Sequence, residues 1–344
     1  MKIYTLLLVP IFISLSCSAQ NQNTSGNGFG VMFYNLENLY DTINDPNKDD
    51  ETFLPGADRK WNDEKYKMKL KQLSKVIATG ADELPVLVGL CEVENSMVVN
   101  DLAATLNLSA ANYAVVHFDS PDERGIDVAL LYNKNVFSPK GKTPIHVTIP
   151  ADSVDYTRDI LYVSGTININ GKKEDLHIFV NHWPSRSEGE EVSAPKRAAA
   201  GQTLKHVIDS LNNKFTDPNI IIMGDFNDTP FDISIQKILL AQEVNTTYTD
   251  ECLVNTLSDK QKAGEGTYNY KGNWQILDQI IVSESLLDNT SIDANINSAR
   301  IVKQDWMLFH HDKYGDSPDR TYSGIKYIGG YSDHLPVFIE LMVH

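Results

Sequence analysis

The sequence is organised around the stretch Gly224-Asp225-Phe226-Asn227-Asp228-Thr229-Pro230. It follows the apolar, β-branched run Asn219-Ile220-Ile221-Ile222-Met223, which predicts a buried strand. That strand carries Asp225 and Asn227 to its carboxyl end, where ligands bind in α/β sheets. A carboxylate and an amide two residues apart can orient an attacking water molecule and bind the oxyanion that forms. A turn that merely closes the strand is the competing interpretation.

Length and composition set the limits of the fold. The chain has 344 residues, 42% of them hydrophobic, which is enough for a sizeable core in one large domain or two. Its formal net charge is -16, so its surface repels polyanions at long range. This charge argues against tight, sequence-specific DNA binding, although bound cations would screen it locally.

The N-terminus has the pattern of an export signal. Lys2 supplies the charge, and residues 4–15 form an apolar run that is too short for a comfortable membrane span. Either a signal peptidase cleaves after Cys17-Ser18-Ala19, or Leu15-Ser16-Cys17 is a loose bacterial lipobox with Cys17 lipidated. We expect residues 1–19 to be a signal, residues 20–28 a flexible tether and residues 29–344 the folded domain. The mature protein is then periplasmic, secreted or an outer-membrane lipoprotein.

Two cysteines remain in the body of the chain, Cys91 and Cys252. A disulfide between them is compatible with the sequence but cannot be deduced from it. Cys91 lies in an apolar run, so we expect an inert, buried thiol there.

Polar side chains also follow two earlier predicted strands. Residues 30–34 lead into Asn35-Leu36-Glu37-Asn38-Leu39, and residues 85–90 lead into Cys91-Glu92-Val93-Glu94-Asn95. The second of these strands is apolar throughout and then ends in a carboxylate, like the strand before Asp225. A buried carboxylate needs a partner, and a cation is one such partner.

Helices are expected between these strands. Asn62 or Asp63 caps a helix that runs to about Thr79 and ends at Gly80, with an apolar face inside and its lysines in water.

Later helices and one loop follow from weaker signals. Ser193 is expected to cap a helix that ends near Leu211, and residues 97–107 and 231–240 are expected to be shorter helices. The acidic, turn-rich residues 41–52 are expected to form a solvated surface loop.

Isolated polar residues mark the later strands. A hairpin is predicted around Asn170-Gly171, and its second strand ends at Asn181-His182-Trp183. Residues 276–282 form another apolar strand that contains Asp278. An isolated buried acid is costly, so Asp278 should bond a specific partner such as a histidine ring. Ser332-Asp333-His334 precedes the final strand.

The strands predicted at residues 113–118 and 126–132 enclose a charged loop that contains Arg124. Asp127 enters the second of them and needs a hydrogen-bonding partner there. Residues 284–330 show no clear pattern, and His310-His311-Asp312 is interpreted as exposed polar residues, because a metal site needs three or four convergent ligands. Alternating strands and helices favour an α/β fold, and the hairpins favour mixed sheets.

These motifs resemble, in their order, those of the endonuclease/exonuclease/phosphatase superfamily, which has the deoxyribonuclease-I-like fold. The resemblance rests on Tyr34-Asn35-Leu36-Glu37-Asn38-Leu39, Leu90-Cys91-Glu92, Arg124-Gly125-Ile126-Asp127, Asn181-His182-Trp183, Gly224-Asp225-Phe226-Asn227, Leu277-Asp278-Gln279 and Ser332-Asp333-His334. Each motif is weak alone, but five or more in the family's order are a strong signal. The resemblance implies a four-layer α/β sandwich, with two packed mixed β-sheets flanked by helices and the site at their shared edge.

The resemblance implies three metal-binding positions. Asn35 and Glu92 match positions that bind the divalent metal, and Asp333 matches one that helps to bind it in some members. Glu37 lies where some relatives have a further acidic ligand, but that position varies. Oxygen ligands of this kind suit Mg²⁺ best, with Mn²⁺ or Ca²⁺ as alternatives.

The resemblance also implies five catalytic residues. Asp225 and Asn227 match the residues that orient the attacking water and hold the phosphate. His334 matches the histidine that contacts the scissile phosphate, and Asp278 matches the acid that orients this histidine. His182 matches a second histidine found in the deoxyribonuclease and sphingomyelinase branches, where abasic-site repair enzymes have a different residue type. The match therefore favours secreted hydrolases.

Two neighbouring residues have less defined roles. Arg124 can add a contact to phosphate. Asp127 is either the partner of a catalytic histidine or a structural residue.

The expected function is a metal-dependent phosphodiester hydrolase, exported and monomeric. Extracellular nucleic acid, bound without strong sequence specificity, is the first choice of substrate. A phospholipid phosphodiesterase or a phosphatase of the same fold is the main alternative, although no clear apolar membrane loop is visible. A non-catalytic surface binding protein is a distant one.

Overall fold

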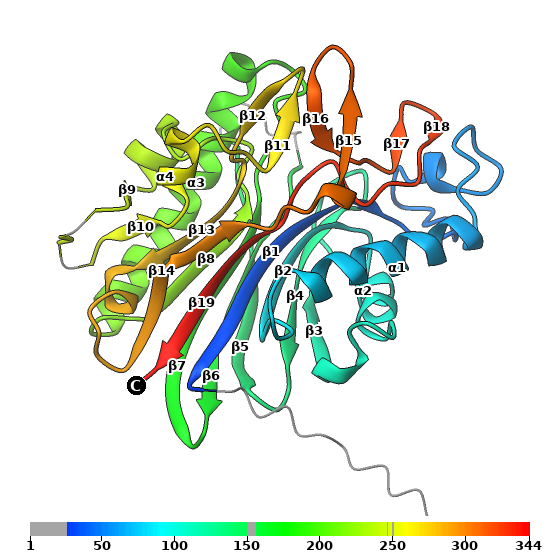
Figure 1. Cartoon of the computed structure of the whole chain (residues 1–344). Coiled ribbons are helices and arrows are strands. Elements are labelled where there is room, and N and C mark those ends of the chain that lie inside the picture. The colour runs from blue at the N-terminus through cyan, green and yellow to red at the C-terminus, as the bar shows by residue number, and fades with distance from the viewer. Residues whose placement is uncertain (1–25, 150–155, 246, 250) are drawn as a thin grey trace, which may run out of the picture.

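The computed structural model describes residues 26–149, 156–245, 247–249 and 251–344, with two mixed β-sheets at its centre (Figure 1). The first sheet has the strand order β14 (Ile292–Ile301), β19 (Val337–Val343), β1 (Gly28–Leu39), β2 (Leu87–Val93), β4 (Asp127–Asn133) and β3 (Tyr113–His117). In it β1 and β2 are parallel, and the other neighbours are antiparallel.

The second sheet carries the stretch that opens the sequence analysis. Its strand order is β5 (Phe137–Ile145), β6 (Ile160–Ile169), β7 (Lys172–His182), β8 (Ile220–Asp225), β13 (Asp278–Ser283), β10 (Leu253–Asn255) and β9 (Ala241–Glu243). The pairs β7–β8 and β9–β10 are parallel, and the rest are antiparallel. The predicted mixed sheets and the hairpin of β6 and β7 are therefore present.

Alternate residues of the central strands face two different cores. Val31 and Phe33 of β1 pack with Ile221 and Met223 of β8 between the two sheets, whereas Met32 faces the outer helices. Because both faces of each sheet are covered, residues 31–34 of β1 and 220–223 of β8 are apolar on both faces, and polar residues begin only where the strands reach the site.

Helices cover both outer faces and complete the predicted four-layer sandwich (Figure 1). On the first sheet α1 (Asp63–Thr79) and α2 (Ser96–Ala103) pack through one apolar cluster, and on the second sheet α3 (Glu190–Lys214) packs through another. The remaining helical segments are short: α4 (Ser258–Lys262), the π-helical turn η3 (Ser234–Ile238), and the 3₁₀ turns η1 (Glu51–Phe53), η2 (Ser109–Ala111), η4 (Glu284–Leu286) and η5 (Asp305–Met307).

Helix α1 begins and ends as predicted. The Asn62 side chain accepts a hydrogen bond from the backbone N–H of Lys65 at 3.0 Å, and Gly80 caps the carboxyl end. The expectation that its lysines face water is wrong for Lys69, which is fully buried. A lysine inside the protein needs hydrogen-bonding partners, and these come from segments distant in sequence.

Two predicted helices differ in extent. Helix α3 begins at Glu190, three residues before Ser193, because acidic residues in its first turn favour the helix N-terminus. The Ser193 hydroxyl instead donates to the carbonyl of Gly189 at 2.7 Å. The helix expected at residues 231–240 is only the turn η3.

The late segment without a clear pattern forms β14 and small hairpins. These hairpins pair β15 (Leu308–His311) with β16 (Gly315–Pro318) and β17 (Tyr322–Ser323) with β18 (Lys326–Tyr327); β11 (Tyr268–Tyr270) pairs with β12 (Asn273–Gln275) just before them. Strands of two to four residues are too short to leave a period-2 pattern. His310 and Asp312 on the first hairpin are exposed, as expected.

Cys91 and Cys252 are both buried and free, so no disulfide joins them. Within the ranges that the structure describes, none of the helices is long and apolar enough to cross a membrane. The export signal expected at residues 1–19, lipidation at Cys17 and residues 20–25 of the expected tether lie outside the described residues.

Candidate active site

The site lies where the carboxyl ends of β1 and β2 meet those of β7 and β8. In the second sheet, the register pairs Asp225 of β8 with His182 of β7 on one side and with Asp278 of β13 on the other. In the first sheet, Asn35 of β1 pairs with Cys91 of β2, directly before Glu92. Strand register thus brings together residues that are far apart in the sequence.

Asn35 connects the two sheets inside the site. Its amide nitrogen donates to Asp225 Oδ2 at 3.0 Å and to Glu92 Oε1 at 3.3 Å. Its amide oxygen accepts a hydrogen bond from the backbone N–H of Glu37 at 2.9 Å. Asn35 is fully buried, so these contacts hold the two acids at a fixed separation.

His334 is held by Asp278, as predicted for the buried acid. The Nδ1 atom of His334 lies 2.7 Å from Asp278 Oδ2, and its Nε2 lies 3.9 Å from Asp225 Oδ2. Burial alone would lower the pKa of His334, but the charges of Asp278 and Asp225 raise it well above its usual value. The two acids beside His334 therefore favour its protonated form.

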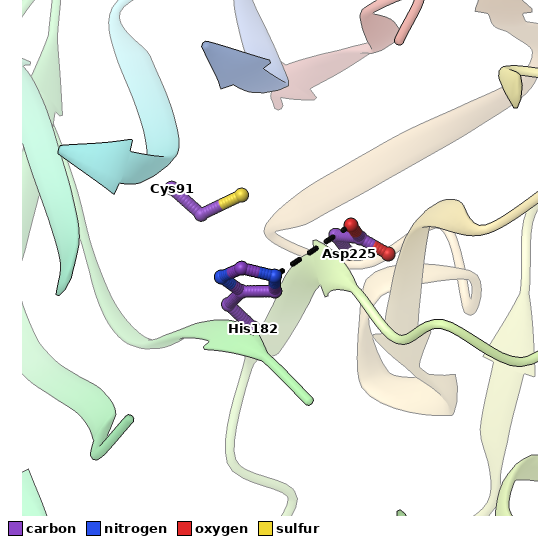
Figure 2. A group of neighbouring side chains, drawn as sticks. All are labelled: Cys91, His182 and Asp225. Atoms are coloured by element: carbon purple, nitrogen blue, oxygen red, sulfur yellow. Dashed lines mark ion pairs between the residues drawn. The ribbon is translucent and has the colours of Figure 1, made fainter. Parts of the chain in front are cut away.

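His182 also lies beside Asp225, and a dashed line in Figure 2 marks the contact between the two side chains. Its Nε2 atom is 3.8 Å from Asp225 Oδ2 and 3.8 Å from Glu92 Oε1. Burial and the nearby charges of Arg158 and Arg124 lower the pKa of His182 well below its usual value. The pKa values of the two histidines beside Asp225 are therefore shifted in opposite directions.

Asp225 and Asn227 form a tight local pair. The backbone N–H of Asn227 donates to Asp225 Oδ1 at 2.9 Å, and burial raises the pKa of Asp225. Asn227 has a φ of +51°, in the left-handed region that Asn tolerates better than most residues. Its amide nitrogen donates to the carbonyl of Trp183 at 3.0 Å and retains a second N–H for another acceptor.

A sequence family connects these residues. The endonuclease/exonuclease/phosphatase family matches residues 30–343, which include all the residues above. The chain belongs to this family. Enzymes of this family are phosphoester hydrolases and typically depend on a divalent metal. A comparison with curated proteins found no match.

Solved structures share the fold at low sequence identity. Humanized D. rerio TDP2 is 14% identical, with a TM-score of 0.55 over 92% of this chain and 99% of that chain. A mannosyl-6-phosphatase from Bacteroides thetaiotaomicron is 17% identical, with a TM-score of 0.54 over 91% and 99% of the two chains. The human Nocturnin catalytic domain, with bound sulfate, is 17% identical, with a TM-score of 0.52 over 93% and 96%. These similarities support the common fold.

The donor set fits the divalent metal of the family. Glu92 and Asp225 offer hard carboxylate oxygens on either side of Asn35, and Asp333 lines the same cavity. Asn35 turns its amide nitrogen, not its oxygen, toward these acids. Glu92 would therefore hold the cation, with Asp333 lining the same cavity, while ligation by Asn35 stays a prediction.

Cys91 is the third member of a group with His182 and Asp225, whose potential ligand atoms lie within 4.8 Å of one another (Figure 2). Metals bind the thiolate form of cysteine, but burial raises the pKa of the Cys91 thiol well above its usual value. Cys91 is a packing residue at this point, in line with the inert thiol expected from the sequence.

Four of the five predicted catalytic residues, His182, Asp225, Asn227 and His334, line a cavity of about 650 Å³; Asp278 lies behind His334 and does not line it. Arg124 also lines it, with its side chain 48% exposed and ion-paired to Asp122 at 3.3 Å. Its guanidinium is thus available to an anion in the cavity. Asp127 is a partner of neither His182 nor His334: it lies 2.9 Å from His117 and accepts two hydrogen bonds from Ser120, which supports the structural interpretation.

Arg158 is a site residue that the sequence did not indicate. It is buried, donates to the carbonyls of His182 at 3.2 Å and Trp183 at 2.6 Å, and pairs with Asp122 at 3.2 Å. It therefore fixes the end of β7 that carries His182. No apolar period or motif surrounds Arg158, so only the tertiary contact identifies it.

Asp228, the next acid of the opening stretch, has a structural role. It accepts hydrogen bonds from buried Arg197 at 2.6 Å, from Arg186 at 3.1 Å and from Ser234 at 2.6 Å. These contacts tie the loop after β8 to helix α3 and the turn η3. The hydrogen bonds to Asp228 therefore also fix the loop that positions Asn227.

The Asp278–His334 pair predicts a measurable change in proton affinity. Asp278→Asn is expected to lower the pKa of His334, because it removes the charge that raises this pKa most. NMR titration of the histidine rings in metal-free protein measures the shift. Asp127→Asn, which removes an acid beside His117, is the matched control and leaves the pKa of His334 unchanged. An unaltered His334 titration in Asp278→Asn contradicts the assignment.

Proposed function

We propose that this chain is an exported, metal-dependent phosphodiester hydrolase that acts as an endonuclease on nucleic acid. The observation that carries the proposal is the arrangement around Asp225, which has the Nε2 atoms of two histidines, His182 and His334, within 4 Å of the same carboxylate oxygen. Phosphodiester hydrolysis needs a base for the attacking water and positive charge for the phosphate. This arrangement can supply both.

Asp225 is suited to hold and polarise the attacking water. Burial makes its carboxylate a stronger base than an exposed aspartate, so it accepts a proton more readily near neutral pH. The free amide N–H of Asn227 can donate to a non-bridging phosphate oxygen. The hydrogen bond from the backbone N–H of Asn227 to Asp225 Oδ1 fixes the positions of the two side chains relative to each other.

His334 and His182 are suited to opposite sides of the phosphate. The His334 imidazolium, fixed by Asp278, can stabilise negative charge on the phosphate or the leaving oxygen. Neutral His182 can accept or donate a hydrogen bond without adding charge. When bound, a divalent cation supplies further neutralisation of charge on the phosphate.

The substrate class is inferred from the site and the family together. A cavity lined by Arg124, His182 and His334 is compatible with a phosphodiester backbone. One similar structure is a mannosyl-6-phosphatase, so a phosphatase acting on phosphorylated sugars is the second candidate. The net charge of -16 favours nucleic-acid binding that is weak and not sequence-specific.

A substrate panel tests the proposal. Purified protein with Mg²⁺ is expected to nick plasmid DNA and to cleave bis(p-nitrophenyl) phosphate, and to lose both activities in EDTA. RNA, sphingomyelin and mannose 6-phosphate are the competing substrates. Glu92→Gln should need more Mg²⁺ for half-maximal activity, because it loses a carboxylate ligand. Preferred cleavage of a sugar phosphate or of sphingomyelin overturns the nuclease assignment.

Single and double histidine variants test the catalytic unit. His182→Ala and His334→Ala should each lower turnover ~10²–10⁴-fold. The double variant should be little worse than either one, because residues that act together lose activity non-additively. His206→Ala, on the exposed side of α3, is the control and should keep wild-type turnover. Near-full activity in His182→Ala refutes its catalytic role.

Export is a separate part of the proposal, supported by Lys2 and the apolar run that follows it. Cell fractionation should find a processed protein outside the cytoplasm. Palmitate labelling that disappears in Cys17→Ala selects the lipoprotein form, and a soluble processed form selects signal-peptidase cleavage. Full-length protein in the cytoplasm contradicts export.

A further inference from the structure

One lysine of helix α1, Lys69, points into the protein toward the active site. Its side chain is 1% exposed, although α1 belongs to the outer layer. We propose that Lys69 is a positioning residue that holds the segment carrying Asp333 and His334 against the end of β1. This inference rests on the phosphodiesterase function proposed above.

Three groups surround the Lys69 ammonium. It donates to the hydroxyl of Thr321 at 2.5 Å and to the carbonyl of Tyr331 at 2.8 Å, and it lies 3.8 Å from Glu37 Oε2. The same Glu37 oxygen accepts a hydrogen bond from the backbone N–H of Thr321 at 2.6 Å. A buried ammonium needs a partner for each of its N–H groups, so these contacts hold the three segments together.

Thr321 and Tyr331 lie at the two ends of the β17–β18 hairpin, so Lys69 closes the base of that hairpin. The catalytic segment follows at once. The hydroxyl of Ser332 donates to the carbonyl of Asn35 at 2.8 Å and accepts from the backbone N–H of His334 at 3.1 Å. Lys69 therefore acts on His334 through Tyr331 and Ser332, without touching the reacting atoms.

Glu37 connects the same cluster to the other side of the site. Its backbone N–H donates to the amide oxygen of Asn35, and its carboxylate binds the Thr321–Lys69 pair. The end of β1 and the segment before β19 thus share one buried set of contacts. Burial lowers the pKa of Lys69, and the charges of Glu37, Asp333 and Glu92 oppose that shift.

Helix α1 offers a matched control in Lys75. Its ammonium lies 3.6 Å from the centre of the Trp306 ring and 3.5 Å from the Tyr331 hydroxyl, but it is exposed and does not bond the backbone of the catalytic segment. Lys75→Met removes a lysine from the same helix and from contact with the same tyrosine. It leaves the buried cluster intact.

The experiment compares Lys69→Met, Thr321→Val and Lys75→Met in the full chain. Turnover and KM are measured on bis(p-nitrophenyl) phosphate, and hydrogen exchange of residues 319–334 is measured by mass spectrometry. Lys69→Met is expected to lower kcat about 10–100-fold, because displacement of a catalytic group by about 1 Å has an effect of this size. KM should change little, since Lys69 does not contact substrate. Exchange in residues 319–334 should be faster.

Thr321→Val removes one acceptor of Lys69 with little change in volume, so it should shift kcat and exchange in the same direction. If Lys69→Met does not fold, Thr321→Val decides. The inference is overturned if kcat and exchange stay at wild-type values, or if Lys75→Met loses as much turnover. An inactive wild-type protein refutes the proposed function instead, and the exchange comparison then decides alone whether Lys69 holds the segment.

Discussion

The Oδ2 atom of Asp225 is the point on which the site depends. It accepts a hydrogen bond from Asn35 at 3.0 Å and has the Nε2 atoms of His182 at 3.8 Å and His334 at 3.9 Å. A carboxylate that is only 2% exposed is stable only where polar or charged groups replace water. Those groups come from both sheets, so the site exists only when the sheets pack against each other.

The same requirement explains the second layer of contacts around the site. Asp278 balances the charge of His334, Arg158 and Arg124 balance Asp122, and Lys69 balances Glu37. Except for the local Arg124–Asp122 contact, these pairs join segments that are distant in sequence. The ion pairs that compensate buried charges therefore also fix the loops. They do so in a chain whose net charge is -16.

The prediction of strands and helices from the sequence was correct where the local hydrophobic pattern and the burial of the residues agree. The apolar run before Gly224 forms β8, the run before Glu92 forms β2, and the Asn170-Gly171 turn closes the β6–β7 hairpin. It was wrong for Lys69, because helical period alone cannot say whether a lysine on the boundary of an apolar face finds buried partners. The small hairpins after residue 284 escaped prediction since their strands are shorter than the patterns that reveal strands.

The sequence by itself determined the α/β class, the mixed sheets, the polar residues at the strand ends and the expectation that buried Asp278 would bond a histidine. These follow from hydrophobic period and from the cost of burying a charge, which are local properties. Only the tertiary structure decided that Asp127 contacts His117, that Arg158 supports His182 and that the pKa values of His182 and His334 are shifted in opposite directions. Proton affinity and partner choice depend on which charges lie within a few ångströms, and strand register and packing set those distances.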